Sequence, residues 1–246
     1  MFHYKNILII SDNDWLTGRF RDWLDTKPQL SELQINFTKT IASLKKNASL
    51  AEFVDLNKDS DVEKIISLHD LVISLNCAQI FPKKLVTARK CINIHPGYNP
   101  DTRGCFSEVF AIRYDTPIGA TIHEMDEELD HGPVIARETV EKNDWDTAET
   151  LYQKIIDKEF ELIDKYFEDI LKNSYTTFTV TEGKVYTKRD FKTLQKIDLD
   201  EKKTAREFID HLRAMTFEGY DNCYFINKDG IKVYVSIKVK AGPETS

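Results

Sequence analysis

The apolar run Asn6-Ile7-Leu8-Ile9-Ile10-Ser11 decides the fold class of this chain. Short continuous runs of this kind are typical of strands that are buried on both faces, as in parallel sheets. The polar turn Asp12-Asn13-Asp14 follows, and after it four apolar residues recur on one helical face: Leu16, Phe20, Trp23 and Leu24. A buried strand, a polar turn and an amphipathic helix together predict a doubly wound α/β fold.

The alternation of strands and helices continues through the first 175 residues. Further buried strands are predicted at Leu71–Asn76, Cys91–His95, Thr121–Met125 and Val134–Ala136. Helices are predicted at Val62–His69 and Phe81–Ala88. A longer helix begins near Asp146, since Asp146 and Glu149 match a capping box, and it ends near residue 174. We therefore expect residues 1–175 to form an α/β, Rossmann-like domain.

The last part of the chain, residues 176–246, follows a different pattern. Two β-hairpins are predicted in it, one at Phe178–Thr187 around Glu182-Gly183 and one at Tyr224–Val235 around Asp229-Gly230. The capping box Thr204-Ala205-Arg206-Glu207 predicts a short helix that ends at Met215. We expect these residues to form a small β-rich C-terminal module.

The composition excludes several classes of function. The 41 acidic residues exceed the 34 basic ones, which gives a net charge of −7. Because nucleic-acid binding depends on a basic surface, we expect no nucleic-acid partner. No apolar run is long enough to span a membrane, and the first residues lack the layout of a signal peptide. The four cysteines form no C-x-x-C pair, so we expect no metal site and a cytoplasmic protein.

Three polar residues lie where buried α/β sheets place their binding sites. Asn93 and His95 alternate with apolar residues, so their side chains leave one face of a strand together, at its C-terminal end. Ligands of open α/β sheets bind outside these carboxyl ends. Asp130 lies between two predicted strands, in the segment Leu129-Asp130-His131-Gly132-Pro133. These three residues are the candidate catalytic group.

An amide, an imidazole and a carboxylate are sufficient for acyl transfer to an amine. The amide of Asn93 can donate to a tetrahedral oxyanion. The imidazole of His95 can take up the proton that leaves the amine, and Asp130 can orient that imidazole or accept the proton itself. No serine or cysteine nucleophile is needed if the amine attacks directly.

These residues resemble those of the N10-formyltetrahydrofolate-dependent formyltransferases. The resemblance rests on Asn93-Ile94-His95, on a Pro-rich loop with Arg103-Gly104, and on Asp130-His131-Gly132-Pro133. It implies a catalytic triad of Asn93, His95 and Asp130, with N10-formyltetrahydrofolate as the cofactor. It also implies cofactor contacts from three segments, namely Cys77, Gln79, Ile80 and Phe81, then Arg103 and Gly104, and then Met125, Asp126 and Asp130.

The loop that follows His95 resembles one subgroup of this family in particular. It reads Pro96-Gly97-Tyr98-Asn99-Pro100-Asp101-Thr102-Arg103-Gly104 and is similar to the loop of the sugar N-formyltransferases, whereas the tRNA and glycinamide enzymes carry a Ser-Leu-Leu-Pro type loop. Asp12-Asn13-Asp14-Trp15 is similar to the same subgroup. The resemblance implies a nucleotide-linked dideoxy amino sugar as the acceptor, most specifically dTDP-4-amino-4,6-dideoxyglucose. It further implies a homodimer and a role in O-antigen or other surface-glycan biosynthesis.

Contacts to such an acceptor are expected near the first strand, in the loop and in the C-terminal module. The expected residues are Asn13, Trp15, Tyr98, Lys188, Arg189, Arg213, Phe217, Tyr220 and Tyr224. The basic residues among them could bind a pyrophosphate, and the aromatic ones could stack on a thymine. Simpler roles are an exposed turn for Lys188-Arg189 and a solvated helix for Arg213. His123 is expected to be a packed strand histidine.

Three alternatives remain open at this point. The first is methionyl-tRNA formyltransferase, against which the net charge of −7 and the small tail argue. The second is hydrolysis of formyltetrahydrofolate without an amine acceptor. The third is an inert module that binds a nucleotide sugar or folate, against which the intact set of Asn93, His95 and Asp130 argues.

Overall fold

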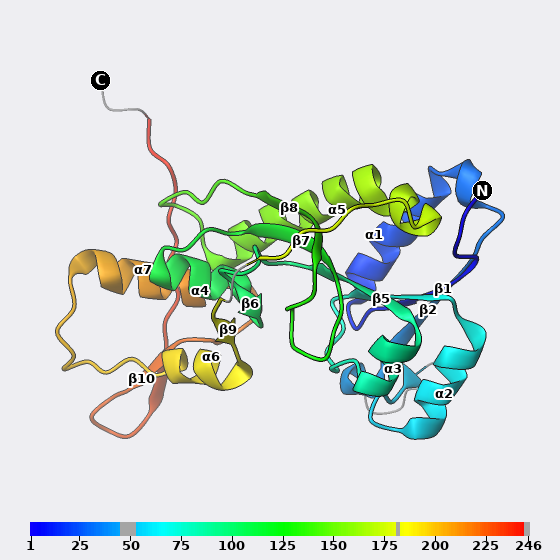
Figure 1. Cartoon of the computed structure of the whole chain (residues 1–246). Coiled ribbons are helices and arrows are strands. Elements are labelled where there is room, and N and C mark those ends of the chain that lie inside the picture. Colours follow the sequence, from blue (N-terminus) through cyan, green and yellow to red (C-terminus); the bar gives the residue numbers. More distant parts are fainter. Residues whose placement is uncertain (45–52, 181–182, 244–246) are drawn as a thin grey trace. The chain divides into compact units, whose positions relative to one another are not determined.

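The computed structural model of the chain describes residues 1–44, 53–180 and 183–243 (Figure 1). The chain divides into two compact units. Unit 1 comprises Met1–His95, Thr121–Arg137 and Glu159–Val180, and unit 2 comprises Pro96–Ala120, Glu138–Lys158 and Thr181–Ser246. The C-terminal residues therefore share a unit with the segment that directly follows His95.

A seven-stranded sheet has the order β3-β2-β1-β4-β5-β7-β8. Its strands are β1 (Asn6–Ile10), β2 (Gln34–Thr40), β3 (Phe53–Val54), β4 (Leu71–Leu75), β5 (Lys90–His95), β7 (Gly119–Glu124) and β8 (Val134–Thr139). The pairs from β3 to β5 are parallel, whereas β5 and β7 pair antiparallel. The predicted α/β, Rossmann-like fold class is thus confirmed.

Helices cover both faces of the sheet within unit 1 (Figure 1). On one face, α2 (Asp59–Leu68) and α3 (Lys83–Ala88) contribute to a core cluster whose buried residues are Leu8, Ile10, Leu56, Val62, Ile65, Val72, Phe81, Leu85 and Cys91. On the other face, α1 (Asp14–Asp25) packs against the C-terminal part of α5 (Ala148–Lys172), where the ring of Phe20 lies 5.5 Å from that of Phe167. Two 3₁₀ turns, η1 (Pro28–Leu30) and η2 (Ile41–Ser43), flank β2.

Unit 2 contains α4 (Ser107–Tyr114), α6 (Lys188–Gln195) and α7 (Ala205–Met215), together with two pairs of short strands. β6 (Arg103–Gly104) pairs in parallel with β9 (Val185–Tyr186), and β10 (Tyr224–Ile226) pairs antiparallel with β11 (Lys232–Tyr234). The hairpin around Asp229-Gly230 and the helix that Thr204 and Glu207 cap are confirmed. The C-terminal module therefore combines its small strand pairs with helices, of which α6 was not predicted.

The predicted hairpin at Phe178–Thr187 is wrong. Phe178 forms an antiparallel bridge with Val134, at the edge of the central sheet. Val185 and Tyr186 pair instead with β6, and Tyr186 is held there because its ring stacks on Phe110 at 4.0 Å. Glu182, in the predicted turn, lies outside the described residues. Long-range pairing has replaced the local pairing that the sequence indicated.

None of the helices in the described ranges is long and apolar enough to cross a membrane. Those ranges also hold no cluster of three or more histidine, cysteine or acidic side chains suited to a metal ion.

Candidate active site

The three residues of the candidate catalytic group come together in unit 1. Asn93 and His95 lie on β5 and are 8% and 4% exposed. Asp130 is equally buried and comes from the loop between β7 and β8. The Asn93 Nδ2 atom donates to Asp130 Oδ1 at 2.8 Å, and His95 Nδ1 lies 3.7 Å from Asp130 Oδ2. One carboxylate is therefore shared between the amide and the imidazole.

The loop that carries Asp130 folds back tightly on the end of β7. Glu124 N donates to Pro133 O at 2.9 Å, which closes the loop. Gly132 packs directly on this turn, since a Cβ atom there would lie 2.0 Å from Glu124 O. Asp130 itself has a φ of 47°, in the left-handed region. The Gly-Pro pair after Asp130 thus allows the close return that brings the carboxylate to β5.

His123 is a fourth member of this group, and the sequence did not indicate it. Residue pairing between β5 and β7 places it opposite Asn93, and it is 1% exposed. His123 Nδ1 lies 2.7 Å from Glu124 O, which can only accept, so Nδ1 carries the hydrogen. In a neutral ring Nε2 then accepts from Asn93 Nδ2 at 3.2 Å, and it lies 3.6 Å from Asp130 Oδ1. Both N–H groups of the Asn93 amide are therefore engaged, which fixes the orientation of the amide.

The first expected cofactor segment follows β4. Burial raises the pKa of the Cys77 thiol to about 12, and the thiol donates to Gln79 O at 3.2 Å. The Gln79 side chain bonds to Asp55-Leu56 through both ends of its amide, at 3.0 Å each. Phe81 is 4% exposed and belongs to the core cluster, whereas Ile80 is 70% exposed. Ile80 is thus the side chain of this segment that offers apolar surface to a ligand.

The other expected cofactor residues occupy both units. Met125 follows β7 and packs against the core cluster, while the Asp126 carboxylate pairs with His131 Nδ1 at 2.7 Å. Arg103 and Gly104 form β6 in unit 2, where Arg103 is 6% exposed. The structure therefore brings the three residues of the catalytic group together within unit 1. Of the other expected cofactor residues, Met125 and Asp126 lie in unit 1, whereas Arg103 and Gly104 lie in unit 2.

Of the expected acceptor residues near the N-terminus, Asn13 has a clear structural role. Its side chain caps α1 by accepting from the backbone N–H groups of Trp15 and Leu16. Trp15 lies in the first turn of that helix and is 50% exposed, with the Arg19 guanidinium 5.7 Å from its ring centroid. Tyr98 belongs to the loop in unit 2, and its backbone N–H donates to Thr102 Oγ1 at 2.8 Å.

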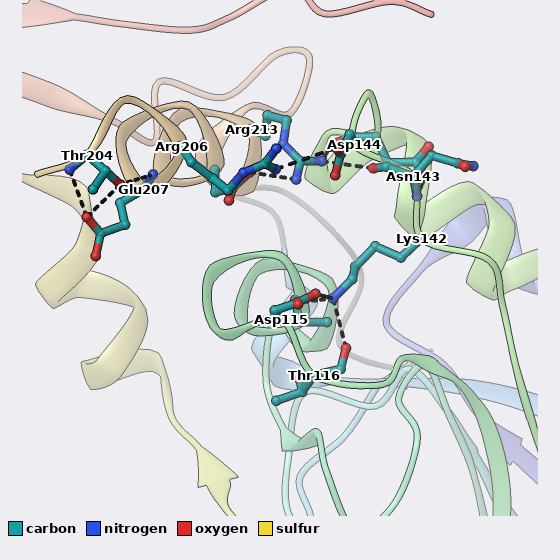
Figure 2. A network of polar contacts seen from close by, with 12 residues as sticks. Asp115, Thr116, Lys142, Asn143, Asp144, Thr204, Arg206, Glu207 and Arg213 are labelled. Atoms are coloured by element: carbon teal, nitrogen blue, oxygen red, sulfur yellow. Dashed lines mark hydrogen bonds and ion pairs between the residues drawn. The ribbon is translucent and has the colours of Figure 1, made fainter.

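Arg213 lies at the C-terminal end of α7 and is 5% exposed (Figure 2). Its Nη1 atom donates to Asn143 O at 3.0 Å and to Asp146 O at 2.6 Å. Its Nε and Nη2 atoms donate to Asp210 Oδ1 at 3.1 and 2.7 Å. Because these bonds occupy most of the guanidinium, they favour a structural role for Arg213 over the expected contact with a pyrophosphate.

The remaining acceptor residues lie on the surface of unit 2. Lys188 and Arg189 are exposed in the first turn of α6. Tyr220 is 68% exposed, and its ring meets that of Phe217 edge-on at 5.6 Å. Tyr224 lies on β10 with the Lys232 ammonium 4.2 Å from its ring centroid. These side chains offer basic and aromatic groups, and their contact with a nucleotide stays a prediction.

Comparison with known proteins gives consistent matches along the chain. A family model described as Formyl transferase matches residues 4–166, and one described as N-formyltransferase dimerization C-terminal domain matches residues 190–241. The chain is 40% identical over 177 residues to dTDP-4-amino-4,6-dideoxyglucose formyltransferase of Mycobacterium tuberculosis, covering 72% of this chain and 76% of the relative.

Two solved structures match almost the whole chain. A 4-N formyltransferase from Francisella tularensis is 39% identical with a TM-score of 0.88, covering 96% of this chain and 98% of the other. A sugar N-formyltransferase from a Shewanella species is 32% identical with a TM-score of 0.91, covering 97% of this chain and 99% of the other.

Proposed function

This chain belongs to the formyl transferase family of enzymes, and from that premise we propose its reaction. The chain transfers a formyl group from N10-formyltetrahydrofolate to the amino group of a nucleotide-linked dideoxy amino sugar. The acceptor is dTDP-4-amino-4,6-dideoxyglucose, a choice supported by the name of the 40% identical relative from Mycobacterium tuberculosis. The similarity to a 4-N formyltransferase supports an amine at the fourth position of the sugar.

The observation that carries this proposal is the buried hydrogen bond between Asn93 and Asp130, with His95 and His123 beside it. Burial strengthens interactions between these groups, because the surrounding dielectric is low. An amide donor, two imidazoles and one carboxylate can stabilise an oxyanion and move a proton without a covalent intermediate. This is the chemistry that formylation of an amine requires.

Each residue of the group has a role in the proposed reaction. Asn93 Nδ2 donates to the oxyanion once one of its two hydrogen bonds, to His123 or to Asp130, has broken. We expect the bond to His123 to break, because it is the longer of the two. His95 takes up the proton that the amine loses, directly or through a water molecule. Asp130 orients His95 or assists in removing that proton. His123 holds Asn93 in position before the exchange.

The residues around this group fit a folate that carries a formyl group. When it is bound, N10-formyltetrahydrofolate supplies the activated formyl carbon. Ile80 offers exposed apolar surface for its rings, and the buried amide of Asn93 suits its formyl oxygen. Cys77, Gln79, Phe81, Met125 and Asp126 shape the loops of this cofactor site in unit 1. Arg103 and Gly104 are further proposed contacts of the cofactor.

The two parts of the chain have different roles in this proposal. Residues 1–175 form the catalytic domain, and residues 176–246 form a homodimer with a second copy, as the match to a dimerization domain at residues 190–241 supports. Lys188, Arg189, Phe217, Tyr220 and Tyr224 contact the nucleotide. The enzyme acts in the cytoplasm and contributes a formylated sugar to O-antigen or another surface glycan.

The decisive experiment supplies the purified chain with N10-formyltetrahydrofolate and dTDP-4-amino-4,6-dideoxyglucose and follows the formamido sugar by mass spectrometry. Parallel reactions contain UDP- and GDP-linked amino sugars, initiator methionyl-tRNA, or no acceptor. We expect product only with the dTDP sugar. Product with tRNA, or formate release without an acceptor, would replace the proposal with one of the other two enzymes. Folate binding without turnover on any acceptor would indicate an inert module.

A further inference from the structure

The loop of residues 98–104, which follows His95 after two residues, is closed by its own polar groups. Asp101 N and Thr102 N donate to Tyr98 O at 2.9 and 3.2 Å. Thr102 is fully buried, its Oγ1 accepts from Tyr98 N at 2.8 Å, and its carbonyl accepts from Ser107 Oγ at 3.1 Å. These bonds make the loop compact, and they tie its end to the start of α4.

A second segment, residues 183–186 of the C-terminal part, meets this loop at its far end. β6 and β9 pair in parallel, with Arg103 opposite Val185 and Gly104 opposite Tyr186. Cys105 N donates to Tyr186 O at 2.9 Å. Gly104 has a φ of 94°, and a Cβ atom there would lie 2.1 Å from Tyr186 O. Only glycine combines this backbone conformation with so close an approach.

The same segment meets the loop a second time, near its middle. A Cβ atom on Gly183 would lie 1.9 Å from Pro100 O and 2.6 Å from Pro100 Cβ. Any larger residue at position 183 must therefore push residues 98–104 and 183–186 apart. The segment thus contacts the loop at two points, with Gly183 against Pro100 and Tyr186 O against Gly104.

Aromatic stacking anchors the segment on α4, which begins three residues after Gly104. The ring of Tyr186 is 3% exposed and stacks on Phe110 at 4.0 Å with an interplanar angle of 9°. It also lies 5.9 Å from the ring of Tyr114, and the Lys184 ammonium is 4.8 Å from its centroid. Phe106 and Phe191 stack in parallel fashion at 4.0 Å, which adds α6 to the same arrangement.

We propose that Gly183 and Tyr186 are positioning residues for ligand binding: through them the C-terminal part of the chain fixes the loop that carries Tyr98 and Arg103. This inference rests on the proposed function and on the expectation from the sequence that Tyr98 contacts the acceptor and Arg103 contacts the cofactor. It gives the C-terminal part a task within each protomer, in addition to dimer formation. A loosened loop weakens ligand binding and leaves the buried group of Asn93, His95 and Asp130 intact.

The test compares Gly183→Ala with Gly242→Ala, because a Cβ atom on Gly242 would meet no heavy atom of the described residues within 4 Å and the φ of Gly242 is not positive. We expect Gly183→Ala to raise KM for the acceptor or the folate about tenfold, with kcat changed less than about threefold. Hydrogen exchange of amides 98–105 should accelerate by about tenfold in this variant, with the rest of the chain unchanged. Gly242→Ala should match the wild type in every measurement.

Tyr186→Leu and Tyr186→Phe form the second pair. Tyr186→Phe keeps the stacked ring and should behave as the wild type, whereas Tyr186→Leu should show the KM and exchange effects of Gly183→Ala. This pair decides the matter if Gly183→Ala does not fold. The inference would be overturned if Tyr186→Leu left both KM and the hydrogen exchange of amides 98–105 unchanged. It would also be overturned if this variant lowered only kcat and accelerated hydrogen exchange along the whole chain. A wild type without formyl transfer would refute the proposed function, while the exchange measurement still tests the positioning.

Discussion

At the scale of single residues, His95 is the group whose replacement should separate chemistry from binding. Asparagine is close in size and can bond to Asp130, but it cannot take up the proton of the amine. We expect His95→Asn to lower kcat by about 10²- to 10⁴-fold while the affinity for the nucleotide sugar, measured by calorimetry, stays within about twofold. His69→Asn, at the C-terminal end of α2, is the matched control. Full activity of His95→Asn would remove His95 from the mechanism.

We expect His123 to affect the rate of the reaction indirectly, by holding the Asn93 amide in position. Its Nε2 accepts from the Asn93 amide, so His123→Phe fills the space of the ring but removes that acceptor. The amide can then rotate, and we expect kcat to fall between about tenfold and hundredfold with little change in KM. Steady-state kinetics of His123→Phe and His123→Asn, the second of which can still bond to Asn93, would measure this. Equal loss in both variants would argue for a packing role instead.

Glu159 lies on α5, where both of its carboxylate oxygens are buried without a hydrogen-bond partner among the described residues. Burial raises the pKa of this carboxyl well above its ordinary value of 4.5. The folded chain then keeps the proton at pH values where the unfolded chain has released it, so stability falls as pH rises above about 4.5. Glu159→Gln removes this dependence.

We expect the free energy of unfolding of Glu159→Gln, relative to that of the wild type, to increase from pH 5 to pH 8. Urea denaturation at several pH values would measure the difference, and Glu161→Gln on the exposed face of the same helix is the control. A difference that does not change with pH would mean that Glu159 ionises in the folded chain as readily as in the unfolded one.

Residue chemistry could be inferred from the sequence, while residue neighbours often could not. The alternation of Asn93 and His95 on one strand is a local property, and the structure agrees with it. His123 was expected to be a packed strand histidine, because nothing local reveals that β7 runs antiparallel to β5 and pairs Asn93 with His123. Arg213 was expected on a solvated helix face or at a pyrophosphate, and only the fold shows its four internal bonds.

At the scale of elements, Arg213 and Lys142 join three segments of unit 2 (Figure 2). Lys142 Nζ donates to Ala111 O and Thr116 O at 2.8 and 3.0 Å and pairs with Asp115 at the end of α4. Arg213 ties α7 to the backbone of the neighbouring residues 143 and 146. The segment 142–146 is therefore held between the ends of α4 and α7.

Replacement of Arg213 should therefore destabilise unit 2. Arg213→Met keeps the apolar stem but leaves the buried carbonyl of Asp146, the partly buried carbonyl of Asn143 and the Asp210 carboxylate without their donor. We therefore expect a loss of about 3 kcal/mol in the free energy of unfolding. Arg206→Met on the same helix should cost less than about 0.5 kcal/mol, since Arg206 is exposed and its contact with Asp144 is 3.5 Å long. Chemical denaturation would measure both. A stable Arg213→Met with a raised KM for the nucleotide sugar would instead support the pyrophosphate role.

Elements with strong local signals were predictable, and elements that depend on distant partners were not. β1 and β4 are continuous buried runs, and α5 and α7 show helical periodicity. β2 was missed because its residues are mostly exposed or half-buried and show no apolar run. β9 has two residues and exists because β6 lies beside it, which no turn signal near residue 182 could indicate.

At the scale of the whole molecule, the exposed apolar residues are concentrated in the part that matches a dimerization domain. Seven large apolar side chains in residues 190–241 are at least 37% exposed: Leu199, Phe208, Ile209, Tyr220, Ile226, Ile231 and Tyr234. A region with this many exposed apolar side chains is a candidate surface for a protein partner. A second copy of the chain is the partner that the match supports.

Charged substitutions in this region should therefore dissociate the dimer. Ile231 and Leu199 are 59% and 61% exposed, and Leu68 on α2 is 54% exposed but lies outside the region. A buried, unpaired carboxylate in an apolar interface costs several kcal/mol, so Ile231→Glu and Leu199→Glu should shift the mass measured by light scattering from two protomers toward one. Leu68→Glu should leave the dimer intact, because its carboxylate stays in water. If all three variants remained dimers, the interface would have to lie away from Leu199 and Ile231, and the C-terminal part would keep only its proposed contacts with the loop and the nucleotide.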